Sequence, residues 1–208
     1  HRWCNSRYPC RRCSSLSTEL YHICSNTHDG LYNILYIILT KLGNFPAIKM
    51  FNGEYNLPEG IPTSLCYSLL GHKESNTVNS VLSKELVLTD FQTDLWKTLN
   101  TGQSVAISAP TSAGKSFIIK EYVLSQLVNN EEICVIYIVP TRALINQVQT
   151  EFQNMVEKAN IHDLFISTIP NLPEDLIAKK KLFILTQERL ELLINPNSDL
   201  YADIIVVD

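Results

Sequence analysis

From about residue 84 onward, short apolar segments alternate with segments of helical periodicity, and this alternation restricts the fold more than any other feature of the sequence. The clearest apolar segment is ICVIYIV at 133–139, which contains no charged or strongly polar residue. A strand of this kind has no solvent-facing side, so both of its faces have to be covered. A parallel sheet with helices on both faces meets this requirement, and right-handed crossovers then give a doubly wound α/β domain.

The elements of this domain can be placed from the spacing of apolar residues. Strands are expected at 104–108, 133–139, 164–169, 181–185 and 204–207. Helices are expected at 90–100, 117–128, 141–158 and 187–194. Thr89 or Asp90 can cap the first of these helices. Residues 84–208 are therefore predicted to form one α/β domain.

The first 80 residues are predicted to form a separate appendage that is mainly helical or irregular. Residues 31–42 have helical character, and the interruption of the apolar run 31–39 by Asn33 favours a buried helix over a segment at a membrane interface. Glycines and prolines at 43–63 predict turns and extended chain. The polar stretch 71–80 is the best linker candidate. No run in the sequence approaches the ~20 apolar residues of a membrane span, so no membrane partner is expected.

Composition excludes a wholly disordered chain, and the charge limits how the chain can bind nucleic acid. The chain has 208 residues, of which 45% are hydrophobic and 18% charged, and this excludes a wholly disordered chain. Its net charge of −4 is uneven: residues 1–80 carry seven Lys/Arg against five Asp/Glu, and residues 81–208 carry ten against sixteen. An acidic balance argues against indiscriminate binding of phosphate backbones, although a local nucleic-acid groove remains compatible with it.

A cluster of soft metal ligands lies in the first 30 residues. Cys10, Cys13, His22 and Cys24 could form a tetrahedral zinc site, but the cluster contains only one clean C-x-x-C spacing. A disulfide or unpaired cysteines are the alternatives, and unpaired cysteines fit the spacing best. Cys66 and Cys134 are each expected to be single buried thiols.

The segment APTSAGKS at 109–116 is the most informative motif. It follows the spacing G-x-x-x-x-G-K-[S/T] of a phosphate-binding loop, with Ala109 in place of the first glycine. Backbone N–H groups of such a loop surround the phosphates, and the following helix adds its positive N-terminus. Gly114 would allow close approach of the backbone, Lys115 would reach the β- and γ-phosphates, and the Ser116 hydroxyl would ligate Mg²⁺. The alternative is a chance Gly-Lys-Ser at a helix start.

Asp208 is a second candidate group, because it ends the apolar strand 204–207. An Asp at the carboxyl end of a buried strand is the second magnesium-organising group of such ATPases. The alternative is that strands often end in Asp because it favours turns.

Four segments together resemble, in order and spacing, motifs of the superfamily 2 DEAD/DEAH-type helicases. They are FQTDLWKTLNTGQSVAISAPTSAGKS (91–116), VPTRALINQ (139–147), LTQERLELL (185–193) and IIVVD (204–208). The block SAPTSAGKS is most similar to the Ski-type and DNA-repair branch. The resemblance covers residues 84–208 and implies a RecA-like P-loop NTPase domain, incomplete in this chain, that uses ATP and Mg²⁺.

The resemblance also implies roles for individual residues. Nucleotide would be bound by Gln92, which reads the adenine edge, and by Ala109, Pro110, Thr111, Ser112, Ala113, Gly114, Lys115 and Ser116. Lys115 and Asp208 would be catalytic, and Ser116 and Asp208 would hold magnesium. Nucleic acid would be contacted by Pro140, Thr141 and Arg142 and by Thr186, Glu188 and Arg189. Simpler interpretations are a solvent-facing Gln92, a solvated Arg142 at a helix start, and a surface salt bridge of Arg189.

The sequence departs from the complete family pattern. The acidic residue that orients water would follow Asp208, and the second RecA-like domain with its arginine finger would follow later, so the chain is interpreted as an N-terminal fragment. The Gly pair found between the two strand-contacting motifs has no counterpart in ISTIP at 166–170. We expect this chain by itself to bind nucleotide weakly and to hydrolyse it negligibly.

The leading hypothesis is the ATP-binding half of a helicase or translocase that binds a single-stranded nucleic acid, with DNA slightly favoured over RNA. Its expected location is intracellular, in the cytoplasm or in the nucleoid or nucleus. Two alternatives stay open. One is a P-loop NTPase without nucleic-acid function, such as a kinase or transporter ATPase; the other is a non-catalytic module that binds nucleotide or nucleic acid.

Overall fold

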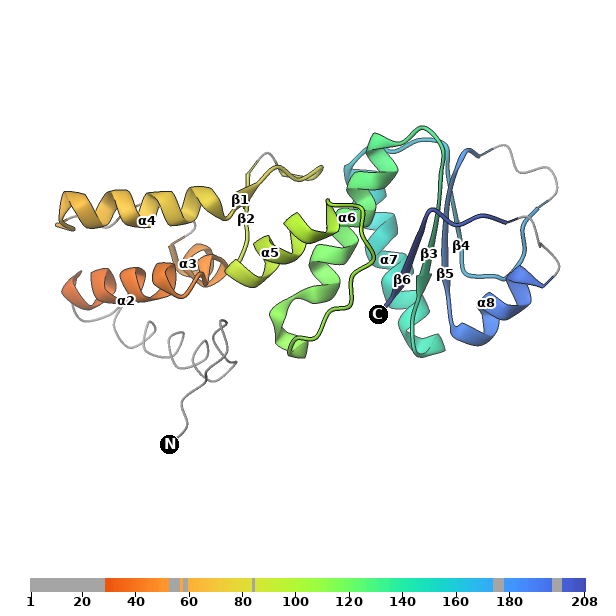
Figure 1. Cartoon of the computed structure of the whole chain (residues 1–208), viewed down its shortest axis with the longest axis horizontal. Coiled ribbons are helices and arrows are strands. Elements are labelled where there is room, and N and C mark those ends of the chain that lie inside the picture. The colour runs from red at the N-terminus through yellow and green to blue at the C-terminus, as the bar shows by residue number, and fades with distance from the viewer. Residues whose placement is uncertain (1–28, 53–56, 58–59, 84, 174–177, 196–199) are drawn as a thin grey trace. The chain divides into compact units, whose positions relative to one another are not determined.

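The computed structural model of the chain describes residues 29–52, 57, 60–83, 85–173, 178–195 and 200–208 (Figure 1). The chain divides within helix α6 into two compact units, residues 1–118 and residues 119–208, and each unit is described by itself. The candidate zinc ligands Cys10, Cys13, His22 and Cys24 lie outside the described residues.

The second unit is built on a four-stranded parallel sheet. Its strands are β3 (Ile133–Ile138), β4 (Leu164–Ser167), β5 (Lys180–Leu185) and β6 (Ile204–Val207), and their order is β4-β5-β3-β6. Every pairing is parallel. The prediction of a parallel α/β sheet is confirmed, as are four of the five predicted strands.

The strands are paired so that three of them end at the same level. Ile138, the last residue of β3, lies opposite Leu185 of β5 and Val207 of β6. The ladder continues one residue further, because the Val139 N–H donates to the Leu185 carbonyl at 2.9 Å and the Asp208 N–H donates to the Ile138 carbonyl at 3.0 Å. The segments that follow β3, β5 and β6 therefore start from one edge of the sheet.

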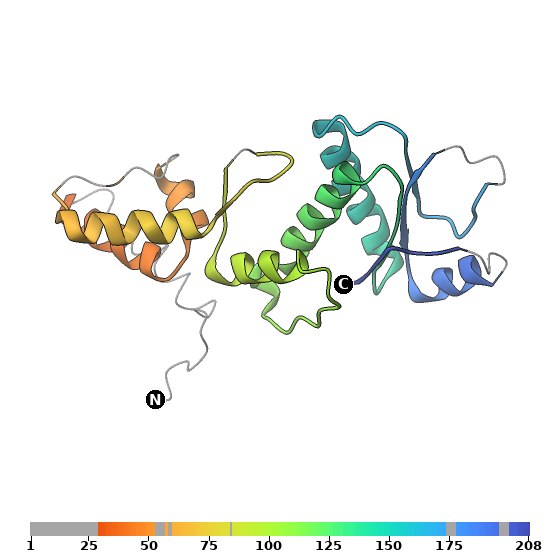
Figure 2. The ribbon, with the colours of Figure 1, turned by 45° about the horizontal axis from the view of Figure 1, so that its top comes forward.

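Strand β3 is covered on both faces, as its composition predicts. On one face, Cys134 and Ile136 pack with Leu193 of α8 (Gln187–Ile194) in a buried cluster. On the other face, the Tyr137 ring meets Phe152 of α7 (Arg142–Lys158) edge to face, with ring centroids 5.6 Å apart. Figures 1 and 2 show α7 and α8 on opposite sides of the sheet. Cys134 is buried as expected, and this burial raises the pKa of its thiol.

Helix α6 (Lys115–Asn129) connects the two units, and a charged pair links it to α7. The Lys120 ammonium, from the α6 segment in the second unit, pairs with the Glu151 carboxylate. Burial acts to raise the pKa of Glu151, but the hydrogen bonds from Lys120 and Gln147 outweigh it and hold that pKa below its ordinary value. The carboxylate is therefore the form that this contact stabilises.

The predicted strand at 104–108 is wrong. Residues 103–110 have no regular secondary structure. Ile107 packs against the cluster of Leu88, Leu95 and Ile118, so the apolar positions of this segment are partly covered. The backbone, however, pairs with no described strand, and alternation of apolar side chains forms a strand only where a partner backbone is available.

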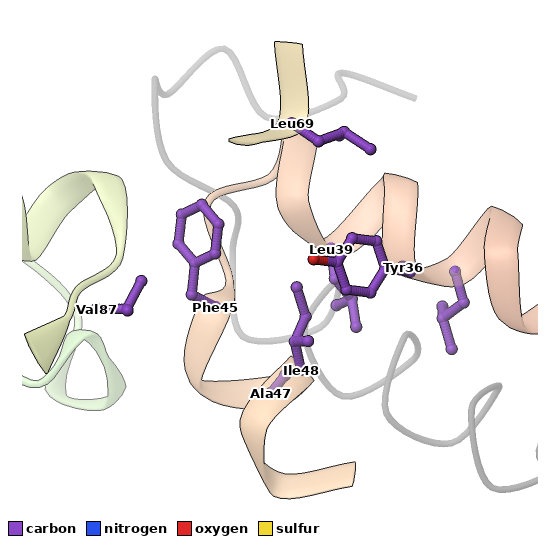
Figure 3. Close-up of a cluster of buried hydrophobic side chains, with 8 residues drawn as sticks. Tyr36, Leu39, Phe45, Ala47, Ile48, Leu69 and Val87 are labelled. Carbon is purple, nitrogen blue, oxygen red and sulfur yellow. The ribbon is translucent and has the colours of Figure 1, made fainter. Parts of the chain in front are cut away.

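The described part of the first unit begins with the helices α2 (Asp29–Lys41), α3 (Phe45–Asn52) and α4 (Thr63–Ser75). They enclose a core that includes Leu39, Phe45 and Leu69 (Figure 3). The helix expected at 31–42 is confirmed, but it is buried on one face only, since Ile34 and Ile38 are 55% and 44% exposed. Every described helix is too short or too polar to cross a bilayer.

Three further expectations about this region are wrong. Helix α3 occupies part of the segment that was expected to be turn and extended chain. Pro46 does not prevent this helix because it lies in the first helical turn, where a residue without an N–H loses no helical hydrogen bond. The proposed linker 71–80 contains the last turn of α4 and the strand β1 (Thr77–Val78). Glu74 and Ser75 are exposed at the end of the helix, whereas Asn76 is buried. Cys66 is half-buried, not buried, and its Sγ donates to the Ile61 carbonyl.

The three helices continue directly into the α/β part of the sequence. Strand β1 pairs antiparallel with β2 (Leu86–Val87), and α5 (Asp90–Leu99) follows two residues later. Helix α5 begins as predicted, with Thr89 as its N-cap. The first unit therefore contains both the N-terminal helices and the residues up to the start of α6.

Candidate nucleotide and nucleic-acid site

The phosphate-binding loop predicted at 109–116 is a tight turn that leads directly into α6. Residues Thr111–Ala113 form a single 3₁₀ turn, closed by a hydrogen bond from the Ala113 N–H to the Pro110 carbonyl at 3.0 Å. Gly114 then takes a left-handed conformation, with φ 76° and ψ 29°, and Lys115 is the first helical residue. The N-terminus of a long helix is thereby placed directly after the loop, where its N–H groups and dipole favour an anion.

The side chain of Lys115 folds back over the start of the loop. Its ammonium donates to the Ala109 carbonyl and, at 3.3 Å, to the Pro110 carbonyl. Both acceptors are neutral backbone oxygens, which phosphate oxygens can replace with stronger, charge-assisted bonds. Ser116 is half-buried in the first turn of α6, and Ser112 is exposed. The predicted loop residues therefore lie together at the N-terminus of α6.

The side chain of Gln92 is hydrogen-bonded to this loop. Its backbone N–H donates to Thr89 Oγ1 at 3.3 Å, and its Oε1 accepts from the Thr89 N–H at 3.1 Å, which together form a capping box. Its Nε2 donates to the Ala113 carbonyl at 3.2 Å. The simple interpretation of a solvent-facing side chain is wrong, since Gln92 is only 9% exposed. Whether it also reads adenine stays a prediction.

In the second unit, the predicted residues gather at the carboxyl edge of the sheet. Asp208 directly follows β6 and is exposed. Thr141 is the N-cap of α7, where its side chain makes no capping hydrogen bond, and both Thr141 and Arg142 are exposed after the exposed Pro140. This edge therefore presents a carboxylate after one strand and a hydroxyl with a guanidinium after its neighbour.

The other predicted group follows β5. Thr186 is the N-cap of α8, but its side chain is buried at 3% exposure, and its hydroxyl has no hydrogen-bond partner among the described residues. Glu188 is exposed in the first turn of α8. Arg189 donates to the Thr168 carbonyl at 2.7 Å, so it holds the segment after β4. Among the described residues, it has no partner for the surface salt bridge considered above.

Comparison with known proteins identifies the family. The model of the DEAD/DEAH box helicase family matches residues 89–208, which are 120 of the 208 residues. The chain belongs to the DEAD/DEAH box helicase family. A curated relative, the DExH-box ATP-dependent RNA helicase DExH9 of Arabidopsis thaliana, is 33% identical over 84 residues. Those residues are 40% of this chain and 8% of that protein, so the match spans only a small part of the relative's length.

The helicase domain is thus an α/β domain with a parallel four-stranded sheet, consistent with an incomplete RecA-like domain. The two groups of predicted site residues lie in different units. The loop and Gln92 belong to residues 1–118, and the residues at the carboxyl edge of the sheet belong to residues 119–208.

The sequence did not point to Tyr137, although this residue of the helicase domain makes a hydrogen bond with the predicted site residue Asp208. The hydroxyl of Tyr137 donates to the Asp208 carboxylate at 2.7 Å from a fully buried ring. Burial, followed by the hydrogen bond and charge of Asp208, raises the pKa of Tyr137, so its phenol stays protonated and remains a donor. The sequence signal for this contact was that Tyr137 carries the single hydroxyl group in the apolar segment 133–139.

Gly114 is required at its position in the helicase loop for two separate reasons. Its φ of +76° is strained for residues with a side chain. In addition, a Cβ at this position would lie 2.3 Å from Gln92 Nε2. The close approach of Gln92 to the loop therefore depends on this glycine.

We predict that Gly114→Ala destabilises the protein more than Gly102→Ala. Gly102 has a similar φ of +72°, but its Cβ would meet nothing within 4 Å, so it reports the backbone strain alone. We expect Gly102→Ala to cost about 1 kcal/mol of unfolding free energy, and Gly114→Ala at least about 1 kcal/mol more. Urea unfolding of both variants measures the difference. Equal losses would show that Gln92 does not restrict the loop.

Proposed function

We propose that residues 84–208 form the ATP-binding half of a nucleic-acid helicase or translocase that couples ATP hydrolysis to single-strand binding and unwinding. The observation that carries the proposal is the phosphate-binding loop, whose turn, left-handed Gly114 and Lys115 lead into the start of α6. Anion binding at such a helix start follows from its N–H groups and dipole. Membership of the DEAD/DEAH box family supports ATP as the nucleotide.

Magnesium fits the donor groups that the sequence assigns to it. Ser116 and Asp208 offer a hydroxyl and a carboxylate, and Mg²⁺ prefers such oxygen ligands. When bound with ATP, the ion would neutralise charge on the phosphates. In this proposal Lys115 binds the phosphates, and Tyr137 orients the Asp208 carboxylate through its hydrogen bond. The side chain of Gln92 keeps the loop in place at Ala113.

The nucleic-acid partner is proposed from the carboxyl edge of the sheet. Thr141 and Arg142 are exposed at the start of α7, where a hydroxyl, a guanidinium and free helical N–H groups can hold a phosphate together. Contacts of this type bind the backbone and do not read sequence. The sequence resemblance to the DNA-repair branch favours DNA, whereas the similarity to the Arabidopsis RNA helicase favours RNA.

Hydrolysis needs charge stabilisation on both sides of the γ-phosphate. We propose that a second RecA-like domain of the whole protein supplies the other side with an arginine finger. The whole protein would act on nucleic acid inside the cell. The 208-residue chain would then bind ATP without turning it over appreciably.

The first test of the proposed function is the loop lysine. Lys115→Ala is expected to lower the affinity of the chain for ATP with Mg²⁺ by about tenfold or more, because a charge-assisted contact to phosphate is lost. Lys97→Ala is the control, since Lys97 is exposed on α5. Isothermal titration calorimetry gives both affinities. Unchanged binding by Lys115→Ala would contradict a nucleotide function of the loop, and turnover by the chain that disappears in Lys115→Ala would contradict the need for a second domain.

The second test concerns magnesium. Tyr137→Phe removes the hydroxyl that orients Asp208 and keeps the ring that packs on Phe152. We expect the Mg²⁺ concentration for half-maximal ATP binding to rise by about tenfold, in the range found for residues that orient metal ligands. Tyr122→Phe is the control for removing a tyrosine hydroxyl from the same unit. An unchanged Mg²⁺ dependence in Tyr137→Phe would show that this hydrogen bond has no role at the metal.

The third test separates a helicase from a P-loop NTPase without nucleic-acid function. Arg142→Ala is expected to weaken binding of oligo(dT) and oligo(rU) to a similar extent. It is also expected to reduce the slope of log K against log salt concentration by about 1, because one phosphate contact is lost. Lys158→Ala, which removes an exposed charge at the other end of α7, is the control. Fluorescence anisotropy over a salt series measures both. Absence of binding to either oligonucleotide would favour the NTPase alternative, and stronger binding of one would identify the substrate.

A further inference from the structure

The N-terminal helices α2–α4 lie outside residues 89–208, the region matched by the helicase family, yet their core extends to strand β2, which ends two residues before that region. Val87 of β2 packs in the core of the three helices, and Figure 3 shows it beside Phe45. Leu88, the next residue, belongs to a different cluster with Leu95 of α5 and Ile118. Two consecutive residues therefore join two cores, which leaves no room for a flexible linker between them.

A polar junction lies at the same place, centred on Asp90. Asp90 Oδ1 accepts a hydrogen bond from Asn76 Nδ2 at 2.6 Å and lies 2.8 Å from His72 Nε2. Both partners belong to the C-terminal end of α4. The turn between α2 and α3 reaches the same carboxylate, because a Cβ on Gly43 would lie 2.3 Å from Asp90 Oδ1. Two separate segments of the N-terminal helices thus converge on one side chain.

Asp90 is the first residue of α5, two positions before Gln92. The capping box between Thr89 and Gln92 fixes the first turn of this helix, so Asp90 and Gln92 move together. Gln92 in turn donates to Ala113 in the phosphate-binding loop. The end of α4 is therefore connected to the loop by the contacts of Asp90, the first turn of α5 and the hydrogen bond of Gln92, and all of these lie within residues 1–118.

We propose that Asp90 is a positioning residue through which the N-terminal helices set the shape of the nucleotide loop and therefore its affinity for nucleotide. The inference rests on the proposed function, since it takes the loop to bind a nucleoside phosphate. An acidic residue in a first helical turn is also favourable because of the helix dipole. That general effect explains neither the two side chains from α4 nor the glycine that packs against the carboxylate.

The test measures the affinity of the 208-residue chain for ADP with Mg²⁺ by isothermal titration calorimetry, beside thermal unfolding. Asp90→Ala is expected to lower affinity by about fivefold, which corresponds to the loss of one net hydrogen bond. Asn76→Ala, which changes the N-terminal helices and leaves α5 intact, is expected to lower it to a similar extent. Asp90→Asn keeps an acceptor oxygen and is expected to retain most of the affinity. Asp94→Ala is the matched control, because it removes an exposed acidic side chain one turn later on the same helix.

The double variant Asp90→Ala/Asn76→Ala separates positioning from general destabilisation. If both residues act through one contact, the affinity of the double variant equals that of the weaker single variant; independent destabilisation gives additive losses. Wild-type affinity in Asp90→Ala and Asn76→Ala would overturn the inference, and so would additive losses. These failures are distinct from failure of the proposed function, in which Lys115→Ala and the unmodified chain bind ADP equally poorly.

Discussion

The parallel register of β3 with β5 and β6 is the constraint on which the second unit depends. Strand β3 is buried on both faces, so its backbone groups have to be paired on both sides, and the pairing places Ile138 level with Leu185 and Val207. As a result, the residues that follow each strand leave the sheet at one edge. Arg142 and Asp208 are more than 60 positions apart in the sequence, yet both follow strands that end at that edge: Arg142 begins the helix after β3, and Asp208 directly follows β6. The covered face of β3 also supplies Tyr137, whose hydroxyl fixes the Asp208 carboxylate.

The loop 109–116, which is predicted to bind phosphate, depends on side chains that hold its backbone carbonyls. Lys115 donates to Ala109 and Pro110, and Gln92 donates to Ala113. Carbonyl groups in a tight turn have few partners in the turn itself, so these side chains stabilise its shape. Gln92 also completes the cap of α5, which means that the loop and the start of this helix form one hydrogen-bonded unit. The cost is that position 114 accepts only glycine without strain, because of its left-handed φ and the nearby amide.

The N-terminal helices belong to the same structural unit as this loop. The sequence suggested an appendage followed by a linker, since polar residues dominate 71–80. In the structure, these residues end α4 and form β1, and the core of the helices continues into β2 at Val87. Asp90 adds a polar contact at the point where the helicase region begins. In the proposed arrangement, the helices support the loop that is predicted to bind nucleotide.

The sequence by itself determined the elements that repeat local patterns: helices α5, α7 and α8, the strands of the sheet, and the order of the motifs. Apolar periodicity and capping act between near neighbours, so they can be read without the fold. Only the tertiary structure decided whether 104–108 forms a strand, because that depends on a partner backbone elsewhere. It also decided that Thr186 is buried and that Arg189 binds the Thr168 carbonyl. The contacts of Tyr137 with Asp208 and of Asp90 with Asn76 join residues that are distant in sequence. No local pattern encodes such contacts, because they arise when buried strands and helices bring separate segments together.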